Sequence, residues 1–184
     1  DAKNFEKLLN DLEEKIMGYT LEQLSRDCRL ALMSDPGSSG RESIRNFIAK
    51  ACADPEFVET HLGPKNTVDR QILYEDPELK FCILAHVYQG PKESTPHDHG
   101  PSWAIYGQAV GVTEMTDWTC IEKPKNGNPG RVHKQKTYQL TPGVAYLYNE
   151  GDLHSPRRTD ETRLIRVEGI NMATVQRDKY EITA

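Results

Sequence analysis

The sequence changes its pattern at Gly63-Pro64, and this change constrains the fold more than any other feature. Beyond it, β-branched and aromatic residues occur in short runs that glycine, proline and asparagine interrupt. Short strands with turn residues between them are typical of a sandwich or a barrel. We predict seven strands, at residues 67–74, 79–88, 103–113, 131–140, 144–148, 162–168 and 172–176.

The residues before this point have a helical pattern. Near the start, apolar side chains recur every three or four positions, as on one face of a helix: Phe5, Leu8, Leu9, Leu12 and Ile16. Thr20 with Gln23 resembles a capping box that opens a second helix through about Leu32.

Two more helices are expected before the strands begin. One should run over about residues 41–51, and a short one should start at Asp54-Pro55, where proline takes the first helical position. We therefore predict a single domain of residues 1–184. It consists of a helical N-terminal region, residues 1–62, and a β-barrel, residues 63–184.

The composition excludes several classes of function. Of 184 residues, 36% are hydrophobic and 28% are charged, and the net charge is −5, as is typical of a soluble globular domain. Lys and Arg form no stripe interleaved with aromatic residues, so we expect no nucleic-acid partner. The longest apolar runs, such as residues 81–85, are too short to cross a bilayer, and no basic-then-apolar leader opens the chain. We therefore expect no membrane partner.

The cysteines give no sign of a redox or zinc motif. They lie tens of residues apart with no CxxC pair: Cys28, Cys52, Cys82 and Cys120. We expect reduced and mostly buried thiols in a cytoplasmic protein.

His97-Asp98-His99 is the main candidate for a metal site. Alternate residues on a strand face the same way, so His97 and His99 are expected to project from one face. Two imidazoles placed in this way can converge on one ion, with bonds of about 2.0–2.1 Å. A third ligand must come from elsewhere, and His154, which follows the turn residues Asn149 and Gly151, is the best of the other four histidines. The alternative is that all three are ordinary loop and surface histidines.

These residues resemble the two sequence motifs of the cupin superfamily. The first motif runs from glycine to His-x-His and on to glycine, and the second from glycine through Pro-x-Gly to histidine. The matching residues here are Gly90, His97, His99 and Gly111, then Gly143, Asn149-x-Gly151 and His154. The resemblance implies a mainly β fold, a cupin double-stranded β-helix barrel (jelly roll) with an N-terminal helical cap.

One ligand of the cupin motif is absent. The glutamate of the first motif falls at Ala104, which leaves three histidines and no carboxylate. Neutral imidazoles suit Fe, Zn, Ni or Cu, and a set of three ligands leaves positions open for substrate or oxygen.

The residues before the first motif resemble the thiol dioxygenase branch of this superfamily, which includes cysteine dioxygenase and 3-mercaptopropionate dioxygenase. The similarity rests on Lys80-Phe81, Tyr88, Gly90 and the His97-x-His99 pair, and it covers residues 67–175. It implies Fe(II) as cofactor, with a small thiol carboxylate and O2 converted to a sulfinate.

The resemblance also implies an arginine that binds the substrate carboxylate. It falls near Arg70, with Gln71 taking the position after a shift of one residue. A guanidinium can grip a carboxylate with two parallel hydrogen bonds. The alternative is a solvated strand arginine.

The second half of the site departs from that family. Its Ser-His-Tyr relay falls at Leu164, Arg166 and Glu168, and the cysteine–tyrosine crosslink of some members is impossible at Ala104 and Glu168. Arg166 and Glu168 alternate with apolar residues and so share a face of their strand. If that face lines the barrel, Glu168 is expected to be a fourth ligand or a general base, and Arg166 to hold an anionic substrate. Alternatively, the two form a salt bridge in solvent.

Aromatic residues near the ligands are candidates for the walls of a substrate pocket: Trp103, Tyr106, Tyr146 and Tyr148. The alternative for them is packing within the barrel. Arg157 and Arg158, just after His154, can attract anions to the site or face solvent.

The leading functional hypothesis is a non-haem iron thiol dioxygenase, with O2 and a small anionic thiol as partners and Fe(II) as cofactor. Zn, Ni and Mn are the alternative metals. A second hypothesis is a non-redox isomerase, lyase or hydrolase in which Glu168 moves protons. A third is a cupin that binds a small molecule without turnover. The sequence is compatible with a monomer or a homodimer.

Overall fold

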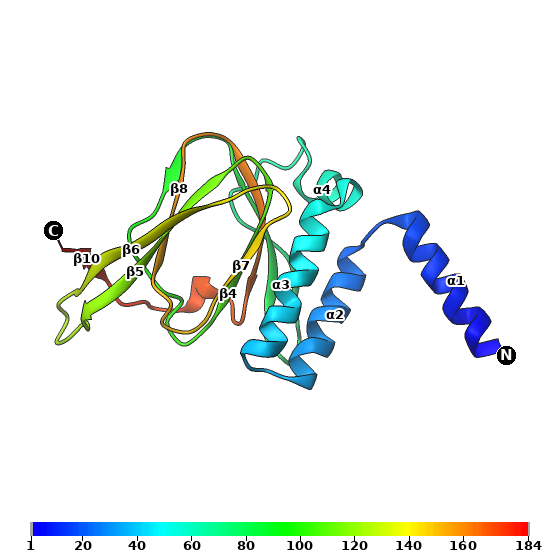
Figure 1. The fold of residues 1–184 in the computed structure, drawn as a ribbon, viewed down its shortest axis with the longest axis horizontal. Helices are drawn as coiled ribbons and strands as arrows, with labels where there is room; N and C mark the ends of the chain where they lie inside the picture. The colour runs from blue at the N-terminus through cyan, green and yellow to red at the C-terminus, as the bar shows by residue number, and fades with distance from the viewer. Residues whose placement is uncertain (1, 184) are drawn as a thin grey trace.

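The computed structural model describes residues 2–183, which form helices first and strands afterwards (Figure 1). The helices are α1 (Ala2–Met17), α2 (Leu21–Ser34), α3 (Ser38–Ala53) and α4 (Pro55–Leu62). The strands are β1 (Gln71–Glu75), β2 (Cys82–Tyr88), β3 (Lys92–Glu93), β4 (Ala104–Val110), β5 (Thr113–Glu122), β6 (Gly130–Leu140), β7 (Ala145–Tyr148), β8 (His154–Arg158), β9 (Thr162–Glu168) and β10 (Tyr180–Ile182). A 3₁₀ turn, η1 (Met172–Thr174), lies between the last two strands.

The strands form two sheets of five strands each. Their orders are β1-β2-β9-β4-β7 and β10-β6-β5-β8-β3, so neighbours in each sheet come from distant parts of the chain. The pairs are antiparallel except for β10 with β6. The two sheets face each other as a barrel, with helices on one side (Figure 1). The prediction of a mainly β, double-stranded barrel preceded by helices is confirmed.

The predicted helix caps are present. The Thr20 hydroxyl accepts a hydrogen bond from the Gln23 backbone N–H at 3.1 Å, and the Gln23 side chain accepts one from the Thr20 backbone N–H at 2.9 Å. The Asp54 carboxylate accepts hydrogen bonds from Glu56 and Phe57 N–H groups at the start of α4. These bonds satisfy backbone donors that have no partner within a helix, and so fix where α2 and α4 begin.

The sheet that contains β9 has an apolar outer face under helices α2 to α4. Ile44 and Ile48 of α3 belong to the same buried cluster as Ile165 and Val167 of β9. Gly107 of β4 allows the close approach of α3, because a Cβ atom there would lie 2.3 Å from Ile48 Cγ2. Burial of this face is the main apolar contribution to the stability of the fold.

The inner face of the same sheet meets the second sheet inside the barrel. Tyr106 of β4 and Leu164 of β9 cluster there with Met115 of β5 and Leu140 of β6. Successive residues of a strand point to opposite faces. The strands of this sheet therefore contribute side chains both to the core beneath the helices and to the core inside the barrel.

Helix α1 extends away from the rest of the chain (Figure 1). The predicted apolar stripe is exposed along it, with Phe5 68%, Leu8 64% and Leu12 52% accessible. The side chain of Ile16, also predicted in this stripe, lies outside the described residues. None of the helices in the described part of the chain is long and apolar enough to span a membrane.

Some predicted strands are displaced or wrong. Strand β9 has the predicted bounds, but β5 and β8 were not predicted, because polar residues dominate their exposed parts. The predicted strand at residues 172–176 is wrong. The Asn171 side chain accepts a hydrogen bond from the Ala173 N–H at 3.1 Å and caps η1 instead, a local alternative to sheet pairing.

The four cysteines are free. Cys28, Cys52 and Cys82 are buried, as expected, whereas Cys120 is exposed. Burial raises the pKa of the Cys82 thiol to about 11, so this thiol stays protonated at neutral pH.

Candidate metal centre

The three predicted histidines converge inside the barrel. His97 and His154 exchange backbone hydrogen bonds of 3.0 and 2.9 Å in an isolated bridge. His154 opens β8, whereas His97 and His99 lie in the segment between β3 and β4. The prediction that His97 and His99 alternate on a regular strand is therefore wrong. Flanking turn residues, including Gly100 with a φ of 57°, interrupt pairing there.

The side chains of these histidines form a compact cluster. One ring nitrogen from each of His97, His99 and His154 lies within 4.8 Å of the others. The rings of His99 and His154 are nearly parallel, with centroids 5.0 Å apart. The centroids of His97 and His154 are 4.7 Å apart. The cluster combines ligands more than 50 residues apart and can hold one metal ion.

Hydrogen bonds to the backbone orient two of the three rings. Nδ1 of His97 lies 2.8 Å from the Thr95 carbonyl oxygen, and Nδ1 of His154 lies 2.9 Å from that of Asp152. A carbonyl only accepts, so we assign the proton of each ring to Nδ1. The lone pair is then on Nε2, as in a metal-binding histidine. His99 Nδ1 is buried with no hydrogen-bond partner.

The surroundings keep the three imidazoles neutral. Burial lowers the pKa of His97 to about 4. Burial lowers the pKa of His99 and His154 as well, and neighbouring positive charges add to the effect. A metal ligand must be unprotonated, so this donor set fits a divalent transition metal.

Tyr106, predicted as a pocket wall or a packing residue, lies against the same cluster. Its Oη is 3.3 Å from His99 Nε2 and 3.4 Å from His154 Nε2. The Arg166 Nη2 donates to this oxygen at 2.7 Å. A signal was present in the sequence: Tyr106 lies two residues after Ala104, on the same face of β4.

Arg166 and Glu168 point into the barrel interior rather than into solvent. Arg166 Nη1 donates to Glu168 Oε1 at 3.1 Å. The other oxygen of Glu168 accepts from Arg70 Nη2 at 3.1 Å and from the Met172 N–H at 2.9 Å. The buried carboxylate is thereby paired on both oxygens, which offsets the cost of removing charge from water. The catalytic roles of Arg166 and Glu168 stay predictions.

Arg70 is not a solvated strand residue. It precedes β1, and its Nη2 also donates to Asn171 Oδ1 at 2.8 Å. A chain of polar contacts thus runs from Arg70 through Glu168 and Arg166 to Tyr106 and the histidines. Its role in binding a substrate carboxylate stays a prediction.

The three other predicted pocket residues lie in different places. Tyr148 stacks on the His154 ring, with centroids 3.9 Å apart, and its hydroxyl pairs with that of Tyr138 at 2.6 Å. Tyr146 is 37% exposed and stacks on Tyr138. Trp103 belongs to the apolar core beneath the helices. Of these residues, the structure brings only Tyr148 against the metal cluster.

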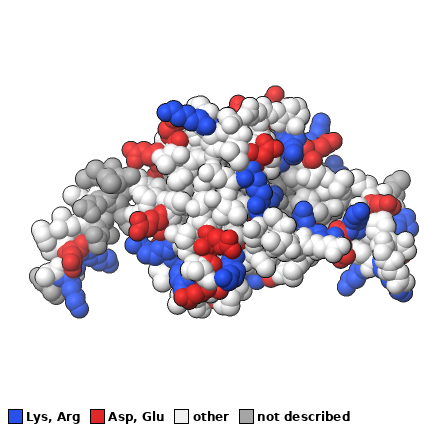
Figure 2. Space-filling model, turned by 180° about the vertical axis from the view of Figure 1, so that it is seen from behind, with Lys and Arg blue, Asp and Glu red and all other residues white. Residues whose placement is uncertain are grey.

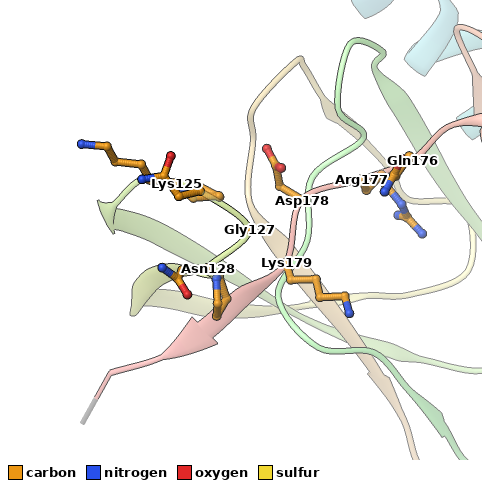
Figure 3. A pocket seen from close by; sticks show the side chains of 10 residues that line it. Lys125, Gly127, Asn128, Gln176, Arg177, Asp178 and Lys179 are labelled. Atoms are coloured by element: carbon orange, nitrogen blue, oxygen red, sulfur yellow. The ribbon is translucent and has the colours of Figure 1, made fainter.

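A cavity of about 800 Å³ leads to the cluster. His97 and Arg166 line it together with Arg177 and Lys179 from the segment before β10. A smaller pocket of about 290 Å³ adjoins it, between hairpin residues such as Lys125 and the C-terminal residues 176–179 (Figure 3). The lining therefore carries cationic groups, Arg166, Arg177 and Lys179, beside the carboxylates of Asp178 and Glu181.

The two arginines after His154 lie in different environments. Arg157 is exposed and pairs with Glu114, whereas Arg158 is buried, donates to Thr113 and lies 4.7 Å from the Tyr88 ring centroid. On the face seen in Figure 2, basic and acidic side chains lie beside each other rather than in broad areas of one sign.

No family model and no curated protein matches the sequence. A cupin-2 domain protein from Shewanella frigidimarina is 13% identical, over 60% of this chain and 89% of that chain, with a TM-score of 0.42. A double-stranded β-helix protein from Klebsiella pneumoniae is 14% identical, over 67% and 88%, with a TM-score of 0.44. KdgF from Halomonas sp. is 17% identical, over 54% and 74%, with a TM-score of 0.41.

The sheet order and the inward-facing histidines define the class of this protein. The chain folds as a barrel of two five-stranded sheets, with a three-histidine cluster able to bind a metal inside it.

Proposed function

We propose that this protein is a non-haem iron dioxygenase that oxidises a small thiol carboxylate to its sulfinate with O2. The observation that carries the proposal is the buried cluster of three neutral histidines, to which no aspartate or glutamate contributes among residues 2–183. Three imidazole ligands leave positions open for further ligands. Bound Fe(II) would supply the redox chemistry between a thiolate and O2.

Three cationic side chains in the lining of the cavity, Arg166, Arg177 and Lys179, support an anionic substrate. Arg177 and Lys179 line the approach to His97, and Arg166 lies deeper in the same cavity. Arg166 Nε is buried with no hydrogen-bond partner, so it can donate to an incoming anion. A carboxylate held there would orient the substrate relative to the metal ligands.

The contacts of Glu168 favour this proposal over a non-redox enzyme with Glu168 as the base. Both of its oxygens already accept hydrogen bonds, from Arg166, Arg70 and the Met172 N–H. These bonds hold the carboxylate in place and engage both of its oxygens within the protein. We assign Glu168 the role of holding Arg166 in place.

The free cysteines accord with the reduced cytoplasm, where we place this activity.

The test is oxygen uptake after anaerobic loading with Fe(II). A panel of thiol carboxylates should give thiol-dependent uptake with sulfinate as product, and thiols without a carboxylate should react more slowly. The Zn-loaded protein is the control for metal identity. No thiol-dependent uptake across the panel would contradict the proposal, and tight thiol binding without turnover would indicate a binding protein instead.

A pair of arginine variants tests the anion site. Arg177→Gln should raise KM by about tenfold or more, the effect of losing one charged hydrogen bond, and leave kcat nearly unchanged. Arg157→Gln is the matched control, because Arg157 is exposed and pairs with Glu114 on the second sheet. Equal KM values for both variants would show that Arg177 does not contact the substrate.

A further inference from the structure

The position of the Tyr106 hydroxyl is unusual for a residue that only packs in the barrel. Tyr106 is 1% exposed, and its Oη lies nearly equidistant from two histidine nitrogens, 3.3 Å from His99 Nε2 and 3.4 Å from His154 Nε2. These are long distances for hydrogen bonds to a hydroxyl, whose usual range is about 2.5–3.0 Å with oxygen. The oxygen therefore lies beside both nitrogens without a close bond to either.

These distances match those between ligands of one metal ion. Two ligands at about 2.0–2.1 Å from a tetrahedral metal are about 3.3–3.4 Å apart. The His154 proton is on Nδ1, so its Nε2 presents a lone pair beside Tyr106 Oη. With the His99 proton on Nδ1, a cation can accept lone pairs from Tyr106 Oη and both Nε2 atoms at once.

The chain also provides for the charge of a phenolate ligand. Arg166 Nη2 donates to Tyr106 Oη at 2.7 Å, and the arginine is itself held by Glu168 at 3.1 Å. One hydrogen bond to the oxygen leaves another lone pair for a metal. Ala104, two residues earlier on the same strand face, is too small to reach an ion.

We propose that Tyr106 is a fourth ligand of the metal centre, binding through Oη, with Arg166 as its positioning residue. Binding forms the metal–oxygen bond and breaks the O–H bond, and the proton leaves to water through the cavity. The centre then has three neutral nitrogens and one anionic oxygen. The inference rests on the metal site of the proposed function but not on its thiol chemistry. Tyrosine is a known protein ligand of iron, as in catalase.

The first test is absorption of the full-length metal-free chain titrated with Cu(II), without thiol. Wild type should develop a visible phenolate-to-copper charge-transfer band at one equivalent, and Tyr106→Phe should bind Cu(II) without this band. Tyr148→Phe is the matched control and should keep it, because its ring also touches His154 but its hydroxyl is directed to Tyr138. Circular dichroism of each variant checks that the fold is retained.

The second test is Zn(II) affinity by competition with a chromophoric chelator. Tyr106→Phe should weaken binding by at least about tenfold, the lower range for losing a group that supports a metal site, while one Zn(II) still binds. A Tyr106→Phe variant with the wild-type band and affinity would overturn the proposal. So would a band that disappears in Tyr148→Phe instead. Absence of thiol oxidation would contradict the proposed function alone, since neither test contains thiol.

Discussion

The two faces of the sheet β1-β2-β9-β4-β7 are both largely buried but differ in chemistry. On β9, Ile165 and Val167 face the helices and are fully buried among apolar side chains. Arg166 and Glu168 alternate with them and face the barrel, where they bond to each other and Arg166 donates to Tyr106 beside the histidines. The outer face depends on volume and shape, whereas the inner face depends on the pairing of particular atoms.

The largest difference between the faces should appear in metal content. His154→Ala should lose nearly all bound metal, because only two of the three imidazole ligands remain. The variant also lacks the ring that packs between His97 and Tyr148. Metal analysis after dialysis against dilute metal measures this. His86→Ala is the control, since His86 is a buried histidine of β2 that bonds to Tyr88 and lies outside the cluster. Equal metal loss in both variants would refute the assignment of ligands.

Removal of the inner carboxylate should be the largest effect on stability. Glu168→Ala leaves Arg166 and Arg70 without their partner and should lower the free energy of unfolding by about 3–5 kcal/mol. Denaturant titration measures it. Glu161→Ala removes a half-exposed carboxylate that pairs with Arg163 just before the same strand, and should cost about 1 kcal/mol or less. A similar cost for both would mean that the inner network does not contribute.

The helix-covered side of this sheet also has one buried ion pair, between Arg29 of α2 and Asp76 just after β1. Burial raises the pKa of Asp76, but hydrogen bonds from Arg29 and from the Leu79 and Glu78 N–H groups outweigh it and lower the pKa to about 2. A carboxyl with a pKa below its unfolded value of 3.8 stabilises the fold above pH 3.8. This contribution, about 2 kcal/mol, declines below pH 3.8 and is lost as the pH falls through about 2.

Denaturant titrations at several pH values measure this effect. Between pH 5 and pH 2, Asp76→Asn should lose less stability than wild type does, because it lacks the carboxyl that becomes protonated. Asp69→Asn is the control, since Asp69 is largely exposed and its nearest cation, Lys92, is 4.0 Å away. Identical pH profiles for wild type and Asp76→Asn would contradict the role of this carboxylate.

The smallest effect should come from a volume change on the outer face. Ile165→Val removes one methylene beneath α3 and should cost about 0.5–1.5 kcal/mol, with unchanged metal affinity. Thermal unfolding and the zinc competition assay measure the two quantities on the same sample. A change in metal affinity without a change in stability would show that the two faces are coupled.

Local features of the sequence predicted a large part of this fold. The caps at Thr20 and Asp54 depend on hydrogen bonds within three residues, and the bounds of β9 follow from alternation along one strand. The strand at residues 172–176 was wrong because one side chain, Asn171, offers the backbone a turn that periodicity does not reveal. Strand β8 was missed although it carries His154, because its pattern is too polar to stand out.

By itself, the sequence determined the ligand types and the local elements: three histidines in cupin-like spacing, a missing carboxylate at Ala104, and helices before strands. Only the tertiary structure decided which residues these side chains contact. Arg70 reaches Glu168 across 98 residues, and Tyr106 reaches His154 across 48. Such contacts depend on strand order, register and the direction of each face, which arise when two sheets pack together and which no short stretch of sequence encodes.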